Sequence, residues 1–163
     1  MKAAVIYAST TGNTEEMAKL ICEGLKAGGA DVSMMKAGSV SAGDIGGYDL
    51  LVLGSPAMGA EVLEEDEMEP FFSSIEGSLS GKKVALFGSY DWGDGEWMRT
   101  WEDRVRSAGG KLFKNANLII HLCHKKDIVR YRRYEFLIKS AVRFILICRT
   151  QVMNTESGAG RFM

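Results

Sequence analysis

Short apolar runs alternate with helical patterns along the first 122 residues of the chain. The runs have the length and branching typical of buried strands, and they fall at residues 3–8, 31–35, 49–53 and 83–87. A fifth strand is predicted between residues 111 and 122, centred on Leu118-Ile119-Ile120. Strands that alternate with helices form parallel sheets covered on both faces, so the pattern predicts an α/β domain.

Three segments between these runs carry apolar positions at helical spacing. The predicted helices follow residue 14 and end at Gly28-Gly29, span 66–77, and begin after Gly95 and end at Gly109-Gly110. Residues 39–47 are polar and glycine-rich and predict a short helix at most. Ligands of such sheets bind beyond the carboxyl ends of the strands, so the loops after the first, third and fourth strands are the candidate site.

The loop after the first strand reads Ser9-Thr10-Thr11-Gly12-Asn13-Thr14. It offers four hydroxyls, one amide and a glycine that lets the backbone approach a ligand closely. The unpaired N–H groups and the dipole of the following helix favour an anion, most often a phosphate. The loop contains no lysine or arginine, so neutral donors would hold that phosphate. The alternative is an ordinary Thr-rich helix cap without a ligand.

The loops after the third and fourth strands place a large side chain between glycines. They read Gly54-Ser55-Pro56-Ala57-Met58-Gly59-Ala60-Glu61 and Gly88-Ser89-Tyr90-Asp91-Trp92-Gly93-Asp94-Gly95. Met58 and Trp92 on facing loops could hold a flat ring from both sides. The alternatives are a gap-filling core methionine and a tryptophan that closes a satellite cluster.

Composition bounds the class of protein. The 163 residues suit one domain, and 46% hydrophobic with 25% charged residues is ordinary for a globular chain. Three scattered cysteines form neither a disulfide framework nor a CxxC pair, and we predict no metal site. The chain opens directly on a strand without a signal-peptide pattern, from which we expect a cytoplasmic protein.

Charge is distributed unevenly along the chain. Residues 1–114 carry 18 acidic and 11 basic side chains, whereas residues 115–163 carry 3 and 9. An acidic rim follows the third strand, and its carboxylates are Glu61, Glu64, Glu65, Asp66, Glu67 and Glu69. Such a rim suits fast, salt-sensitive docking on basic partners. The alternative is a solvated acidic helix start.

The three loops, in this order, closely resemble the FMN-binding segments of short-chain flavodoxins over residues 1 to about 120. The resemblance implies a doubly wound five-stranded parallel sheet of order 2-1-3-4-5. It implies an electron carrier with non-covalently bound FMN and no catalytic residue. The acidic side chains near the ring would make it a low-potential, one-electron carrier, because negative potential disfavours adding the second electron. Its partners would be redox enzymes with basic docking surfaces, and it would be a monomer that binds no nucleic acid.

The resemblance also implies a role for each loop. Residues 9–14 would bind the FMN phosphate, Met58 the inner face of the ring and Trp92 the outer face, while Ser89 and Tyr90 would line the ring and its ribityl chain. Glu61 would accept a hydrogen bond from N3–H of the ring. The expected binding residues are Ser9, Thr10, Thr11, Gly12, Asn13, Thr14, Ser55, Pro56, Ala57, Met58, Gly59, Ala60, Glu61, Ser89, Tyr90, Asp91, Trp92 and Gly93.

Two positions depart from the usual pattern of this family. Ala60 stands where the family often has Asp, and Asp91 where it often has Gly. In this family, the backbone carbonyl at the position of Gly59 reverses its direction after the flavin has accepted its first electron. We expect a type II turn over residues 58–61 in that state, with positive φ on Ala60.

The end of the chain does not fit the family. We expect a domain over residues 1–149 that ends in an atypical basic helix at 123–149, followed by a disordered tail at 150–163. The apolar stretch at 134–148 is interrupted by charges and shorter than the roughly 20 residues of a membrane span. Alternatives are a membrane-surface or nucleic-acid-binding helix, or a frame-shifted reading of the original terminus.

Two other functions share parts of this pattern. An FMN-dependent reductase of quinones or similar molecules would need an open pocket beside the ring, which Trp92 would cover. A cofactor-free signalling receiver would need an aspartate at the end of the third strand, where this chain has Gly54-Ser55. The electron carrier is therefore the preferred prediction.

Overall fold

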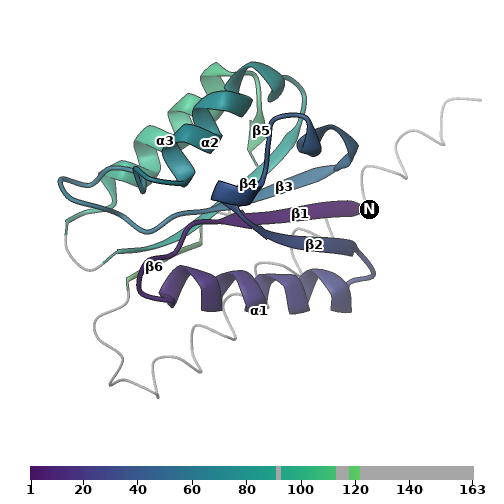
Figure 1. The fold of residues 1–163 in the computed structure, drawn as a ribbon, viewed down its shortest axis with the longest axis horizontal. Helices are drawn as coiled ribbons and strands as arrows, with labels where there is room; N and C mark the ends of the chain where they lie inside the picture. Colours follow the sequence, from purple (N-terminus) through teal and green to yellow (C-terminus); the bar gives the residue numbers. More distant parts are fainter. Residues whose placement is uncertain (91–92, 113–117, 122–163) are drawn as a thin grey trace, which may run out of the picture.

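The fold is a parallel sheet with helices on both faces, in a computed structural model that describes residues 1–90, 93–112 and 118–121 (Figure 1). The strands pair in the order β2-β1-β3-β4, with the fifth position beside β4. Their bounds are β1 Lys2–Tyr7, β2 Asp31–Lys36, β3 Leu50–Gly54 and β4 Lys83–Tyr90. The predicted α/β class and the order 2-1-3-4-5 are confirmed.

The fifth position is shared by two short strands, not filled by the single strand that the sequence predicted. β5 (Lys111–Leu112) pairs with the start of β4, and β6 (Leu118–His121) pairs with its end. Lys83 pairs with Lys111, and Phe87 pairs with Leu118. The two positions on β4 are therefore four residues apart, whereas their partners are seven residues apart. An insertion of three residues therefore separates the two pairings, which an apolar run alone does not reveal.

Each face of the sheet has its own core. Side chains alternate across a strand, so Ala4 and Ile6 of β1 face one side, and Ala3 and Val5 face the other. The first side packs under α2 (Met68–Ile75) and α3 (Glu96–Ser107), and the second under α1 (Asn13–Ala27), as Figure 1 shows. Both faces are buried, which explains why β3 is buried along its whole length and β1 from Ala3 onward.

Local boundaries differ from the predicted ones in two places. The segment predicted as one short helix at most forms two 3₁₀ turns, η1 (Ala37–Ser39) and η2 (Asp44–Gly47), and a third, η3 (Glu76–Ser78), extends α2. The fourth strand was predicted to end at Phe87, but β4 continues to Tyr90. Pairing with β6 satisfies its backbone over these extra residues, so Ser89 and Tyr90 lie on a strand and not in a loop.

An ion-pair cluster joins α2 to α3. The Arg104 guanidinium donates to both carboxylate oxygens of Glu69 at 2.6 and 2.8 Å and to Glu76 at 2.9 Å. It also lies over the Phe72 ring, 4.8 Å from the centroid. The pKa of the Glu69 carboxyl is lowered, chiefly by its hydrogen bond to Arg104. These contacts fix α3, at whose start the last candidate loop ends.

Two glycines allow β3 and β4 to pack closely where they reach the candidate site. A Cβ on Gly54 would lie 2.0 Å from the Phe87 ring. A Cβ on Gly88 would lie 2.1 Å from the carbonyl oxygen of Ser55 and 2.2 Å from the indole of Trp97. A carbonyl oxygen cannot move without shifting its strand, so Gly88 is required by space and not by backbone angle.

The predicted helix at 123–149 and the predicted disordered tail at 150–163 lie outside the described residues. Both therefore remain predictions. Within the part of the chain that the structure describes, no helix is long and apolar enough to cross a membrane.

We expect Gly88→Ala to destabilise the protein without FMN by about 1–3 kcal/mol, because the added methyl overpacks a site bounded by backbone. Gly77→Ala is the matched control, since a Cβ there meets nothing within 4 Å. Urea unfolding followed by far-UV circular dichroism measures both free energies. Equal stability of the two variants would contradict the packing account.

Candidate functional site

The three candidate loops meet at the carboxyl edge of β1, β3 and β4. Backbone hydrogen bonds continue the ladder beyond the strands: Ala8 N–H donates to the Gly54 carbonyl at 2.9 Å, and Ala57 N–H donates to the Ser89 carbonyl at 2.8 Å. Ser55 N–H donates to the Phe87 carbonyl at 3.2 Å. The sheet itself therefore sets the spacing of the loops, as expected for a site at the carboxyl ends of parallel strands.

The first loop, residues 9–14, is here called the phosphate loop. Gly12 has a φ of 87° and leads into α1, and a Cβ built on it would meet nothing within 4 Å. The Ser9 hydroxyl oxygen accepts hydrogen bonds from the N–H groups of Gly12 and Glu15, both at 3.2 Å. The loop thus curls around the helix start, where the N–H groups and the helix dipole present partial positive charge.

Within the phosphate loop, exposure separates two kinds of side chain. Thr10 and Thr11 are exposed at its tip, and Ser9 and Asn13 are half-buried. Thr14 is buried, and its hydroxyl lies 3.0 Å from the hydroxyl of Ser89 on β4. Thr14 and Ser89 therefore connect the phosphate loop to the next-but-one strand, and the structure places the Ser89 side chain beside this loop.

The second loop, residues 55–64, forms a hairpin, here called the ring hairpin. Ser55, which is fully buried, accepts a hydrogen bond from Glu64 N–H at 3.0 Å through its hydroxyl oxygen. Nearer the tip, Met58 and Val62 exchange two backbone hydrogen bonds of 2.9 Å. Gly59, Ala60 and Glu61 form the tip, with Met58 half-buried beside it.

Backbone angles at this tip differ from those of the turn that we expect after the first electron. Positive φ occurs at Gly59 (46°) and at Glu61 (54°), and not at Ala60. In the described part of the chain, Glu61 is the only residue other than glycine with positive φ. Ala60 is unstrained in this conformation, so a type II turn would require the hairpin to rearrange.

Glu61 also links the ring hairpin to the third loop. Its Oε1 accepts a hydrogen bond from Gly95 N–H at 2.8 Å, and its carboxylate packs where a Cβ on Gly93 would lie. Gly93 and Gly95 have φ values of 95° and 83°, so both glycines adopt the left-handed backbone conformation on either side of Asp94. Residues 93–95 are here called the glycine turn. The two loops that were predicted to face one another are thus joined by one carboxylate.

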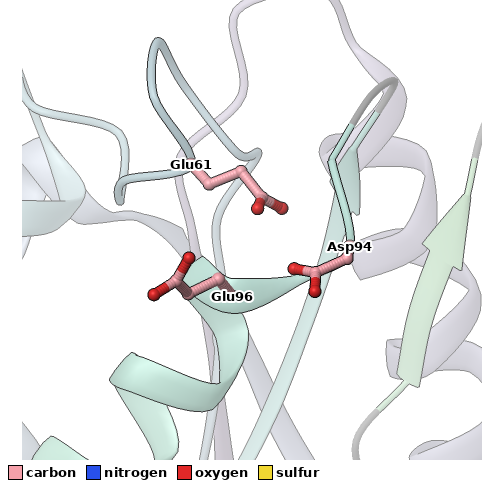
Figure 2. Close-up of side chains that lie close together, drawn as sticks. All are labelled: Glu61, Asp94 and Glu96. Carbon is pink, nitrogen blue, oxygen red and sulfur yellow. The ribbon is translucent and has the colours of Figure 1, made fainter.

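Three carboxylates converge at this junction, as Figure 2 shows for Glu61, Asp94 and Glu96. One oxygen from each lies within 4.8 Å of the others. Two like charges at this distance repel by about 1 kcal/mol in water, and more where water is excluded. Glu61 already accepts from Gly95, and Asp94 is paired with Arg99 at 2.9 Å. A metal site is therefore not inferred, because existing partners explain two of the three carboxylates.

Two of the six carboxylates of the acidic rim, Glu64 and Glu69, are not free surface charges that could dock a partner. Glu64 is 3% exposed, and its carboxylate accepts from three backbone N–H groups, those of Asp66, Glu67 and Met68, at 2.9–3.0 Å. It satisfies donors at the start of α2 that would otherwise lack partners. The Glu69 carboxylate forms an ion pair with Arg104. Glu61 is held by Gly95, so the rim charges left for docking are Glu65, Asp66 and Glu67.

Most of the expected binding residues lie together, in the three loops at one edge of the sheet. Asp91 and Trp92 lie outside the described residues, and their roles stay predictions. Sequence reasoning missed Gly95, Glu64 and Arg99 as site-forming residues. Gly93 and Gly95, on either side of Asp94, were a usable signal for left-handed backbone angles. By contrast, nothing in the sequence distinguishes the buried Glu64 from the exposed Glu65.

Known proteins resemble this chain over the same region. The sequence profile of the family described as Flavodoxin matches residues 5–130, past residue 120 where the resemblance was expected to fade. The flavodoxin of Clostridium beijerinckii is 51% identical over 105 residues, covering 64% of this chain and 76% of its own. The flavodoxin of Megasphaera elsdenii is 46% identical over 112 residues, covering 69% and 82%.

Comparison of structures agrees. The solution structure of two-electron reduced Megasphaera elsdenii flavodoxin superposes with a TM-score of 0.73 at 38% identity, covering 86% of this chain and 98% of that one. These matches favour neither a reductase of small molecules nor a signalling receiver. The chain belongs to the flavodoxin family and is an electron carrier that binds FMN.

Proposed function

We propose that the phosphate loop, the ring hairpin and the glycine turn hold the FMN through which this chain carries electrons. The observation that carries the proposal is the meeting of these three loops at the carboxyl edge of adjacent strands, tied together by Thr14–Ser89 and by Glu61–Gly95. Each loop supplies a different part of the recognition.

The phosphate loop suits the single phosphate of FMN. The clear space over Gly12 leaves room for a ligand to approach the backbone, and the donors around it are neutral hydroxyls and N–H groups. The hydroxyl of Ser9 can rotate to donate to a phosphate oxygen, while the N–H groups at the start of α1 hold the negative charge. The proposed phosphate ligands are Ser9, Thr10, Thr11, Gly12, Asn13 and Thr14.

The ring hairpin and the glycine turn suit the ring. We propose that Met58 packs against its inner face and that Trp92 stacks on its outer face, following the family motif. The Glu61 carboxylate has two oxygens, and only Oε1 is used by Gly95, so Oε2 is available to accept from N3–H of the ring. Pro56, which is buried, and Ala57 fix the hairpin base.

Bound FMN supplies the one-electron chemistry, since it accepts and releases single electrons. The chain controls the energy of these electrons by the charge that it places nearby. Glu61, Asp94 and Glu96 keep the local potential negative, which disfavours the second electron because the fully reduced ring is an anion. A low second potential follows from that arrangement.

The partners that we propose are redox enzymes with basic docking surfaces. We propose further that the protein is a monomer and that it acts in the cytoplasm. Glu65 and Asp66 are exposed at the start of α2, next to the ring hairpin, and Asp94 is exposed on the glycine turn. Electrostatic attraction between such a rim and a basic surface accelerates encounter.

We expect the purified protein to bind one FMN and not FAD, because the phosphate loop provides for one terminal phosphate. Release of the flavin by acid, followed by chromatography against both standards, identifies it. Protein that stays colourless after FMN is added, although circular dichroism shows it folded, would contradict the proposal.

We expect Glu61→Gln to weaken FMN binding by about 1–3 kcal/mol, as for loss of a charged hydrogen-bond acceptor. The amide replaces one acceptor oxygen by an NH₂ donor, so that group would face the N–H either of Gly95 or of the ring. Glu65→Gln removes the same charge from an exposed position and is the matched control. Fluorescence titration of the FMN-free proteins gives both dissociation constants; equal values would argue against a ring contact by Glu61.

We expect electron transfer to a basic reductase to slow steeply as salt is added, because the rim charges act mainly on encounter. Stopped-flow rates across ionic strengths test this, and the double variant with Glu65→Gln and Asp66→Asn should flatten the dependence. A rate that does not change with salt would show that the rim does not guide docking.

A further inference from the structure

The glycine turn is held from two sides, and only one of them belongs to the ring hairpin. Glu61 binds the turn through Gly95 N–H. On the other side, Arg99 in the first turn of α3 donates to the main-chain carbonyl of Asp94 through Nη1 and to its carboxylate through Nη2, each at 2.9 Å. The guanidinium fork therefore grips backbone and side chain of the same residue.

The helix itself does not explain this arginine. A cation in the first turn of a helix lies near the positive end of the helix dipole, which disfavours it. Across the turn, however, three carboxylates converge, and in the described part of the chain Arg99 is the only cation paired with any of them. The pKa of the Asp94 carboxyl is lowered, first of all by its hydrogen bond to Arg99.

We propose that Arg99 is a positioning residue that holds the glycine turn against the ring hairpin, by gripping Asp94 and by offsetting the repulsion among Glu61, Asp94 and Glu96. This inference rests on the proposed placement of the FMN ring between these two loops. Arg99 itself makes no proposed contact with the ring. It acts through Asp94 and Gly95, which determine whether Glu61 is in place.

Arg106 provides a matched control on the same helix. Its side chain is 54% exposed and that of Arg99 is 56% exposed, and each donates to an aspartate through a guanidinium nitrogen at 2.8–2.9 Å. Arg106 pairs with Asp103 and Glu102, within α3 and away from the three loops. Arg99→Met and Arg106→Met therefore change net charge equally, but only the first releases the glycine turn.

We expect Arg99→Met to raise the dissociation constant of FMN about three- to tenfold, and Arg106→Met to leave it unchanged. Added salt should reduce the deficit of Arg99→Met, because screening weakens repulsion among the carboxylates. Asp94→Asn in the Arg99→Met background should also recover part of the loss, since it removes one of the repelling charges. Arg99→Lys keeps the charge without the fork, and we expect it to recover only the salt-sensitive part.

A second measurement needs no FMN. In the FMN-free protein, hydrogen exchange at Gly95 N–H should accelerate in Arg99→Met and not in Arg106→Met, because the turn that presents this group to Glu61 has lost its anchor. Failure of the wild-type protein to bind FMN would overturn the proposed function. The hydrogen-exchange result would then still test whether Arg99 holds the glycine turn in place. Equal exchange and equal FMN affinity in the two methionine variants would overturn the inference about Arg99, as would a deficit that neither salt nor Asp94→Asn reduces.

Discussion

The close approach of β3 and β4 at their carboxyl ends is the constraint on which the site depends. Neither Gly54 nor Gly88 has space for a Cβ. The Phe87 ring occupies that space at Gly54, and the Ser55 carbonyl and the Trp97 indole occupy it at Gly88. The ladder then continues through Ser55 and Ala57 into the ring hairpin. Because both faces of the sheet are covered, the chain can expose polar loops to a ligand only at its edges, and this edge has the three adjacent loops.

Few direct contacts then coordinate the three loops. The Thr14–Ser89 contact links the phosphate loop to β4, and the Glu61–Gly95 hydrogen bond links the ring hairpin to the glycine turn. Behind the hairpin, the buried Glu64 carboxylate connects its base to α2. The acidic segment after β3 therefore does two different things, since Glu64 organises backbone where water is excluded, and its exposed neighbours offer charge to a partner.

Periodicity and glycine placement predict the strands, a sheet covered on both faces and the three loops, because these patterns are local signals of burial and turns. The strand order followed from the family resemblance. The sequence did not predict the split of the fifth strand, since pairing register depends on the neighbouring strand. Nor did it separate Glu64 from Glu65, because burial of a carboxylate is decided by N–H groups brought in by the helix that follows. The role of Arg99 depends likewise on the glycine turn around Asp94, which only the fold brings against the ring hairpin.

The central claim is that the three loops act as one FMN site, with the phosphate at the start of α1. Amide chemical shifts of the ¹⁵N-labelled, FMN-free protein test it directly when FMN and riboflavin, which lacks the phosphate, are titrated in parallel. We expect FMN to shift the amides of Gly12, Glu15 and Gly95, and riboflavin to shift Gly95 while leaving Gly12 and Glu15 nearly unchanged. Binding of FMN that leaves Gly12 and Glu15 unmoved, or that shifts them equally with riboflavin, would contradict the account.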